Sequence, residues 1–152
     1  MVGIASGSRI LIANDAEEDR RFLARRLQRL GYAVEQAGNG FEAITLVKGA
    51  APDVVIIDLV MPGLGGLLLL RALRKADPDL PVIVLTERAA LDGCVQAMQE
   101  GLLFNCLLKP LPDVALLEAA IQRAIEFRRL CRKARQAERI IEMATTNERM
   151  VP

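Results

Sequence analysis

VVIIDLVMPG, at residues 54–63, is the stretch of sequence that decides the fold. Its first four residues are β-branched, and they are apolar at consecutive positions rather than at alternate ones. A strand of a parallel sheet with helices on both faces has this composition. The run ends at Asp58, and the turn-forming pair Pro62 and Gly63 follows shortly after it. The stretch therefore predicts a buried parallel strand with a carboxylate at its C-terminal end.

Two other runs, Ile10–Ala13 and Val82–Leu85, are also rich in β-branched residues and apolar at consecutive positions. The first is followed by Asn14 and Asp15, and the second by Thr86. Two weaker strands complete the set. The predicted strands are residues 10–13, 33–37, 54–57, 82–85 and 105–108.

Segments with apolar residues at helical spacing alternate with these strands. The first four predicted helices are Asp15–Leu30, Gly40–Lys48, Gly66–Lys75 and Leu91–Glu100. Strand and helix then alternate five times along the chain, which predicts an α/β fold with a doubly wound parallel sheet. In such sheets ligands bind beyond the C-terminal ends of the strands. The polar residues that end the strands should therefore gather at one site.

The last predicted helix begins near Pro112 or Asp113, and no glycine or proline interrupts it before Pro152. Its second half has a short, alanine-rich heptad pattern of apolar residues. The heptad positions are Phe127, Leu130, Ala134, Ala137, Ile141 and Ala144. Two interpretations remain open for residues 128–152: a coiled-coil linker, or a solvated, charged helical tail.

The composition limits the classes of function. Apolar residues make up 52% of the 152 residues, and 20 basic against 19 acidic residues leave a net charge of +1. This balance gives no electrostatic reason to expect nucleic acid or a membrane as partner. Histidine is absent, and the three cysteines form no CxxC pair, so a zinc site is not expected. We expect a soluble, cytoplasmic protein with three reduced thiols, of which Cys94 and Cys106 are buried.

Four motifs occur in order at the ends of the predicted strands. Asn14 and Asp15 follow the first strand, Asp58 precedes Met61-Pro62-Gly63, Thr86 ends the fourth strand, and Lys109-Pro110 follows the fifth. Together they resemble the response-regulator receiver domains of two-component signal transduction. The resemblance covers residues 9–127 and implies five strands in the order 2-1-3-4-5 with five helices. Residues 1–8 are then a flexible N-terminal tail, and residues 128–152 a helical extension.

The resemblance implies that Asp58 is the phosphoacceptor and that Mg²⁺ is the cofactor. A carboxylate attacks a phosphoryl group poorly unless the charge on that group is neutralised. Mg²⁺ prefers oxygen ligands and retains water. The implied ligands are the carboxylates of Asp15 and Asp58 and the backbone carbonyl of Val60. Asn14 would contribute weakly or through a water molecule.

By the same resemblance, two further side chains contact the transferred group. Lys109 is a flexible cation that can reach one phosphoryl oxygen, and the hydroxyl of Thr86 can donate a hydrogen bond to another. The phosphorylated aspartate would then change the surface formed by the fourth helix, the fifth strand and the fifth helix.

The sequence departs from the family at several positions. Asn14 replaces an acidic residue, which removes one negative charge and should weaken Mg²⁺ binding. Glu87 replaces a small residue, Cys106 stands at the position of the usual switch aromatic, and Gly65-Gly66 replaces Asp-Gly. We therefore expect an atypical but working receiver. The alternative is a degenerate receiver that acts as a phosphorylation-independent binding or dimerisation module.

The resemblance also predicts the partners. A sensor histidine kinase or a phosphotransfer protein would supply the phosphoryl group. A homodimer would form through the C-terminal helix or through the surface of the fourth helix, fifth strand and fifth helix. We expect no direct contact with nucleic acid or membrane and no output enzyme domain in this chain. Three interpretations of the tail remain open: a stand-alone receiver whose long helix dimerises, a receiver with its signalling helix from a longer protein, or a tail that docks on a partner.

Overall fold

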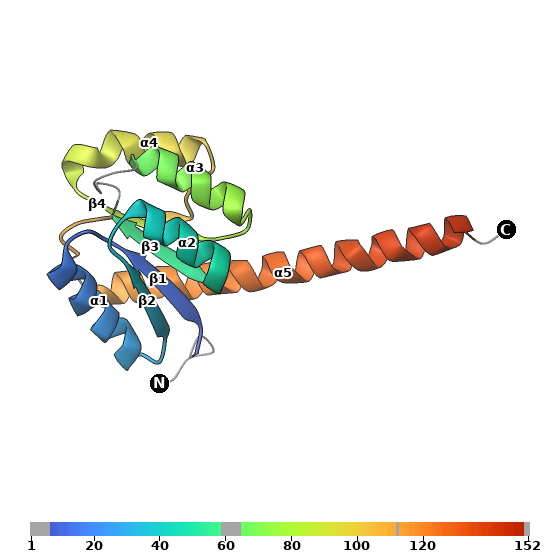
Figure 1. Cartoon of the computed structure of the whole chain (residues 1–152), viewed down its shortest axis with the longest axis horizontal. Coiled ribbons are helices and arrows are strands. Elements are labelled where there is room, and N and C mark those ends of the chain that lie inside the picture. The colour runs from blue at the N-terminus through green and yellow to red at the C-terminus, as the bar shows by residue number, and fades with distance from the viewer. Residues whose placement is uncertain (1–6, 59–64, 112, 151–152) are drawn as a thin grey trace.

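The computed structural model describes residues 7–58, 65–111 and 113–150, the last four without their side chains. Strands and helices alternate along the chain (Figure 1). The strands are β1 (Arg9–Ala13), β2 (Ala33–Ala37), β3 (Val54–Asp58), β4 (Val82–Thr86) and β5 (Asn105–Leu108). The helices are α1 (Glu17–Arg29), α2 (Gly40–Ala50), α3 (Gly66–Ala76), the 3-10 turn η1 (Arg88–Ala90), α4 (Leu91–Gln99) and α5 (Val114–Met150).

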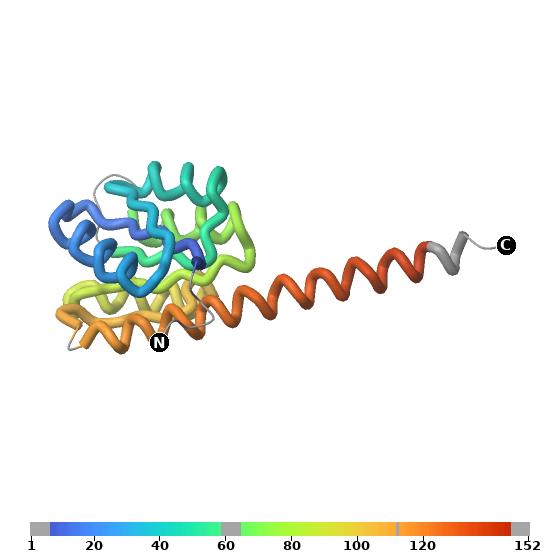
Figure 2. Tube along the Cα trace, turned by 90° about the horizontal axis from the view of Figure 1, so that it is seen from below, coloured from blue at the N-terminus to red at the C-terminus, as the bar shows by residue number. Residues whose placement is uncertain are grey.

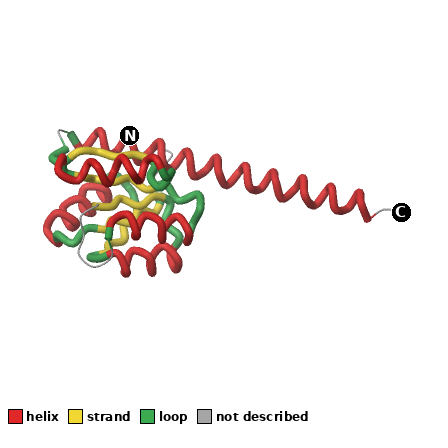
Figure 3. Tube along the Cα trace, turned by 90° about the horizontal axis from the view of Figure 1, so that it is seen from above, coloured by secondary structure: helices red, strands yellow, loops and turns green. Residues whose placement is uncertain are grey.

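The described strands form one parallel sheet in the order β2-β1-β3-β4-β5. The predicted fold class and strand order are confirmed. Figure 3 shows the strands between two layers of helices. In this register Ala13 lies opposite Ile57, and Ile57 lies opposite Val84. The C-terminal ends of β1, β3 and β4 therefore lie side by side.

Side chains of the central strands alternate between two apolar clusters, one on each face of the sheet. Leu11 of β1 packs in a cluster with residues of α2, α3 and α4. Its neighbours Ile10 and Ile12 pack on the opposite face with residues of α1 and α5. Both faces are covered, which explains why the central strands are apolar at consecutive positions between their ends.

The helix boundaries differ from the predicted ones by up to two residues. Helix α1 begins at Glu17, not at Asp15, because the Asn14 side chain accepts a hydrogen bond from the Ala16 N–H at 2.9 Å and forms a turn. Asn39 caps α2 by accepting from the Glu42 N–H at 2.9 Å. Thr86 belongs to β4 itself, and η1 intervenes before α4.

Helix α5 is 37 residues long and continues well beyond the sheet (Figure 2). At its start, the Asp113 side chain accepts a hydrogen bond from the Ala115 N–H at 3.0 Å. Side chains from 132 to 146 are exposed. The predicted starting residue Pro112 and the N-terminal residues 1–6 lie outside the described residues. Within the described part of the chain, no helix combines the length and apolar character that a membrane span needs.

Candidate functional site

The candidate site lies at the C-terminal edge of the sheet, where four strands end in, or are directly followed by, a residue with a polar side chain. Asp58 is the last residue of β3, and Thr86 is the last residue of β4. Asn14 directly follows β1, and Lys109 directly follows β5. The neighbouring order β1-β3-β4-β5 brings these ends together. The predicted gathering of motif residues at one edge is therefore observed.

Lys109 and Asp58 form an ion pair at the centre of this edge. The distance from Lys109 Nζ to Asp58 Oδ2 is 2.5 Å. Both side chains are largely buried, with 28% of the lysine and 13% of the aspartate side chain exposed. The Lys109 N–H also donates to the Thr86 carbonyl at 2.8 Å, so the backbone that carries the lysine is attached to β4. The site therefore places a cation against the aspartate carboxylate.

Thr86 is fully buried beside this pair. Its hydroxyl donates to the backbone carbonyl of Glu87 at 3.2 Å, and the Glu87 side chain is exposed. Strand pairing places Asp58 opposite Leu85, the residue before Thr86. Thr86 directly follows Leu85, the residue paired with Asp58. Its hydroxyl can rotate away from the Glu87 carbonyl toward a new acceptor.

Asn14 is held by several local hydrogen bonds. Besides the side-chain bond to Ala16, its backbone N–H donates to the Ala37 carbonyl at 3.0 Å. Its own carbonyl accepts from Arg20 Nη1 at 2.8 Å. Arg20 also donates from Nε to Gln36 at 3.2 Å. Sequence reasoning missed Arg20, because nothing in its spacing distinguishes it from the other arginines of α1.

The donor atoms available to a metal ion are oxygens. Asp58 and Asp15 supply carboxylates, with Asp15 exposed. The Asn14 amide oxygen is already an acceptor for Ala16 but keeps a second lone pair. Val60, whose carbonyl is the third predicted ligand, lies outside the described residues. Among the described residues no three or more His, Cys, Asp or Glu side chains cluster as a metal site. Few protein ligands, all oxygens, fit Mg²⁺ with its retained waters better than zinc.

The cysteines differ from expectation. Cys94 is buried as predicted, whereas Cys106 is only half-buried. The two are joined in a disulfide between α4 and β5, with their Cα atoms 7.0 Å apart. The expectation of three reduced thiols is therefore wrong for this pair, and Cys131 is free. The residues are separated by 12 positions, and only the packing of α4 on the sheet brings them together. Cys106 also lies opposite Val84, two residues before Thr86.

Comparison with known proteins agrees with this arrangement. The family model of the response regulator receiver domain matches residues 10–122. The chain is 41% identical over 93 residues to the response regulator MprA of Mycobacterium sp. strain KMS. That match covers 61% of this chain and 40% of MprA, so the chain spans well under half of this longer relative.

Two solved structures are also similar. A response regulator receiver domain protein from Clostridium thermocellum is 32% identical, with a TM-score of 0.77, over 82% of this chain and 98% of that one. The response regulator protein TrrA from Thermotoga maritima, in complex with Mg²⁺ and BeF, is 28% identical, with a TM-score of 0.68, over 77% of this chain and 98% of that one. The fold, the polar edge of the sheet and the family match over residues 10–122 lead to one conclusion: the chain belongs to the response regulator receiver domain family.

Proposed function

We propose that Asp58 accepts a phosphoryl group, in a reaction that depends on Mg²⁺, from a sensor histidine kinase or a phosphotransfer protein. The observation that carries this proposal is the 2.5 Å contact between Lys109 Nζ and Asp58 Oδ2. A carboxylate beside a lysine, at the edge of a parallel sheet where ligands bind, has the parts that phosphoryl transfer needs. In a two-component system the domain would act in the cytoplasm.

The chemistry proposed for Asp58 is a direct displacement. One of its carboxylate oxygens forms a bond to phosphorus while the phosphorus–nitrogen bond of the donor phosphohistidine breaks and the imidazole nitrogen takes up a proton. Lys109 exchanges its contact with Asp58 for a phosphoryl oxygen. Thr86 turns its hydroxyl from the Glu87 carbonyl toward another phosphoryl oxygen. These two donors neutralise the negative charge that the carboxylate must approach.

Asp15, Asp58 and the carbonyl of Val60 would hold the magnesium ion, with Asn14 acting through a water molecule. Bound there, Mg²⁺ supplies positive charge next to the transferred group. The complex of TrrA with Mg²⁺ and BeF supports this choice of cation by similarity. The side chain of Asn14 is neutral and already bonded to Ala16, so this site should bind Mg²⁺ more weakly than one with a third carboxylate.

A second candidate function is a degenerate receiver that binds partners without phosphorylation. Asn14 favours it, since its amide replaces an acidic ligand. The disulfide at Cys106 favours it too, because it ties β5 to α4, the surface through which phosphorylation would act. Both candidates use that surface or the extended α5 as the contact with a partner or a second copy. They differ in whether Asp58 is modified.

Intact mass measurement separates the two. The protein is incubated with Mg²⁺ and acetyl phosphate, beside an Asp58→Asn variant and a sample in which EDTA removes the metal. Addition of one phosphoryl group in the parent sample alone supports the proposal. No addition in any sample, with the fold intact by circular dichroism, supports the degenerate receiver. Addition in the Asp58→Asn variant would assign the phosphoacceptor to another residue and refute the proposal.

A further inference from the structure

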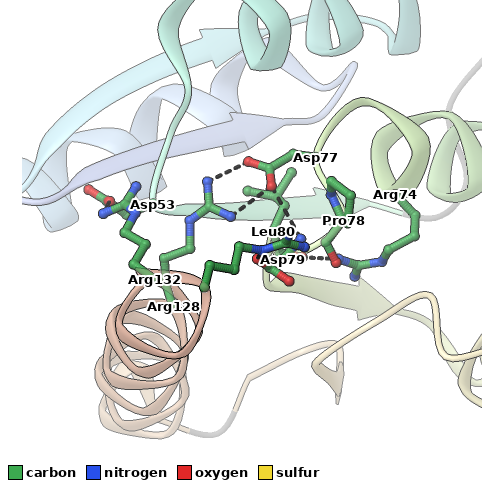
Figure 4. A network of polar contacts seen from close by, with 9 residues as sticks. Asp53, Arg74, Asp77, Pro78, Asp79, Leu80, Arg128 and Arg132 are labelled. Atoms are coloured by element: carbon green, nitrogen blue, oxygen red, sulfur yellow. Dashed lines mark hydrogen bonds and ion pairs between the residues drawn. The ribbon is translucent and has the colours of Figure 1, made fainter. Parts of the chain in front are cut away.

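The first turns of α5 beyond the sheet carry arginines that pair with aspartates of the receiver. Arg128 is 6% exposed, and its two terminal nitrogens contact both carboxylate oxygens of Asp77, one of them at 2.8 Å (Figure 4). Asp77 is the C-cap residue of α3 and directly follows Ala76. A bidentate pair of this kind fixes the orientation of both side chains. Helix α5 is therefore attached to the end of α3.

Two further pairs continue along the helix. Arg132 lies 3.2 Å from Asp53, whose other carboxylate oxygen accepts the Arg9 N–H at the start of β1. Arg135 pairs with Asp79 in the turn between α3 and β4. We call these three arginines, with Asp53, Asp77 and Asp79, the arginine latch. Its members lie on successive turns of α5 and at the N-terminal edge of the sheet, opposite the candidate site.

The turn that receives the latch is itself held in place. Arg74 of α3 donates to the carbonyls of Pro78 at 3.0 Å, Leu80 at 2.6 Å and Leu102 at 3.0 Å. Asp77 also accepts the N–H of Asp79 at 3.2 Å. The latch is thus anchored on backbone that the receiver fold already fixes, and it can transmit that fixed orientation to α5.

Phe127, the first heptad residue, packs against Phe104 of the receiver, with the ring centroids 5.3 Å apart. The latch arginines and the apolar heptad residues after Phe127 occupy opposite sides of α5. Each residue turns the helix by about 100°, and every latch arginine is followed two positions later by a heptad residue. The pairs are 128 and 130, 132 and 134, and 135 and 137. Arg139 and Ile141 continue the series. Because the latch faces the receiver, the apolar stripe of Leu130, Ala134, Ala137, Ile141 and Ala144 faces away from it. Leu130 is 52% exposed and Ile141 is 64% exposed.

Charges beside the stripe are complementary to those of a second copy. Lys133 and Glu138 flank it five positions apart, the spacing at which side chains of two parallel, in-register helices meet across a coiled coil. Lys133 of each copy would face Glu138 of the other. In an antiparallel pair this matching is lost. The alanines in the stripe allow the two helices to approach closely.

We propose that the arginine latch sets the rotation of α5 so that the stripe of one chain packs against the same stripe of a second copy, in parallel. The two receivers then lie at the same end of the dimer. This inference deepens the proposed dimer contact of the receiver. It does not depend on phosphorylation of Asp58, so the tests below use unphosphorylated protein without Mg²⁺.

The stripe is tested by sedimentation equilibrium of the full chain. Ile141→Gln should raise the dimer dissociation constant at least roughly tenfold, the equivalent of losing one buried apolar contact. Met143 is 66% exposed and lies off the stripe, so Met143→Gln is the matched control and should leave the constant unchanged. A monomeric parent protein, or equal effects of both variants, would overturn the proposal.

The orientation is tested by charge exchange. Lys133→Glu and Glu138→Lys should each weaken the parallel dimer several-fold, because like charges then face each other. The double variant restores opposite charges and should recover the parent dissociation constant. If the double variant dimerises no more tightly than the two single variants, the parallel arrangement is wrong.

The latch is tested by hydrogen exchange in the Ile141→Gln background, at a protein concentration well below its dimer dissociation constant, so that the monomer is measured. Arg132→Gln with Arg135→Gln retains the buried Arg128 pair, so the receiver should still fold. Amides of residues 130–138 should then exchange at least roughly tenfold faster, since the helix there loses its anchor. Arg139→Gln, next in the series and beyond the three latch pairs, is the control and should change nothing. Equal exchange in the two variants would remove the latch from the proposal.

Discussion

Arg128 donates hydrogen bonds to both carboxylate oxygens of Asp77, a residue 51 positions earlier in the chain. The arginine is buried, and its ion pair joins the last helix to the end of α3. Removing one partner of such a pair leaves the other charged, buried and unpaired, which is strongly destabilising. The pair therefore bears on both the stability of the receiver and its pH dependence.

We expect Asp77→Ala to lower the free energy of unfolding by about 3 to 5 kcal/mol, because Arg128 then keeps a buried charge without its partner. Asp79→Ala removes the partner of Arg135, which is about half exposed, and should cost about 1 kcal/mol or less. Urea denaturation followed by circular dichroism measures both values. Equal losses of unfolding free energy in the two variants would show that burial does not make the Arg128–Asp77 pair more important for stability than the exposed one.

Stability should also fall in acid through Asp77. The hydrogen bonds from Arg128, more than its charge, hold the pKa of the Asp77 carboxyl below its usual range. A lowered pKa in the folded state means that the unfolded chain binds the proton more readily. The stabilisation is complete above about pH 4, the ordinary aspartate value, and is lost as pH falls through the lower folded value.

Urea titrations between about pH 6 and pH 3 measure this contribution. The parent protein should lose stability more steeply than Asp77→Asn, which has no titrating group at this position. Parallel curves for the two proteins would mean that Asp77 titrates alike in the folded and unfolded chains.

Lys109→Gln should slow phosphorylation by acetyl phosphate by roughly 10- to 100-fold, the equivalent of losing one charge-assisted hydrogen bond in the transition state. Lys109→Arg keeps the charge but changes its reach, and should retain an intermediate rate. The rate is measured by intact mass against time at saturating Mg²⁺. An unchanged rate in Lys109→Gln would remove the lysine from the proposed reaction.

Asn14→Asp should lower the Mg²⁺ concentration needed for half-maximal phosphorylation, by about tenfold for one added charge close to the ion. Asn39→Asp is the matched control. This substitution adds the same charge after β2, and the new aspartate can still cap α2 in place of Asn39. The control should leave the Mg²⁺ dependence unchanged. The same shift in both variants would point to a general effect of net charge.

The disulfide predicts how many thiols react. Alkylation of denatured protein that has not been reduced should modify Cys131 alone, and alkylation after reduction should also modify Cys94 and Cys106. Cys131→Ser should show no reactive thiol before reduction. Mass spectrometry counts the added groups. Three modified thiols in the unreduced parent protein would instead mean that all three cysteines are reduced, as the sequence predicts.

Much of the fold could be predicted from local pattern. Strand β3 is buried on both faces, and its residues are therefore apolar at consecutive positions. Helix α1 is buried on one face, and its apolar residues therefore recur at helical spacing. Both elements are present. Helix α1 starts later than its apolar spacing predicts, because Asn14 uses its side chain to form a turn. The order of the strands came from resemblance to a family, since local periodicity carries no information on which strands are neighbours.

The sequence by itself determined the kinds of element, their order, and the presence of Asn14, Asp58, Thr86 and Lys109 at strand ends. Only the tertiary structure decided which of these side chains touch. Lys109 meets Asp58 because β4 and β5 follow β3 in the sheet.

The same holds for Cys94 with Cys106 and for Arg128 with Asp77. Burial of one or both faces of a segment determines where its apolar residues lie, so it can be recognised in the local sequence. A contact between distant residues depends on how the segments pack, and the spacing of either residue in its own segment carries no trace of it.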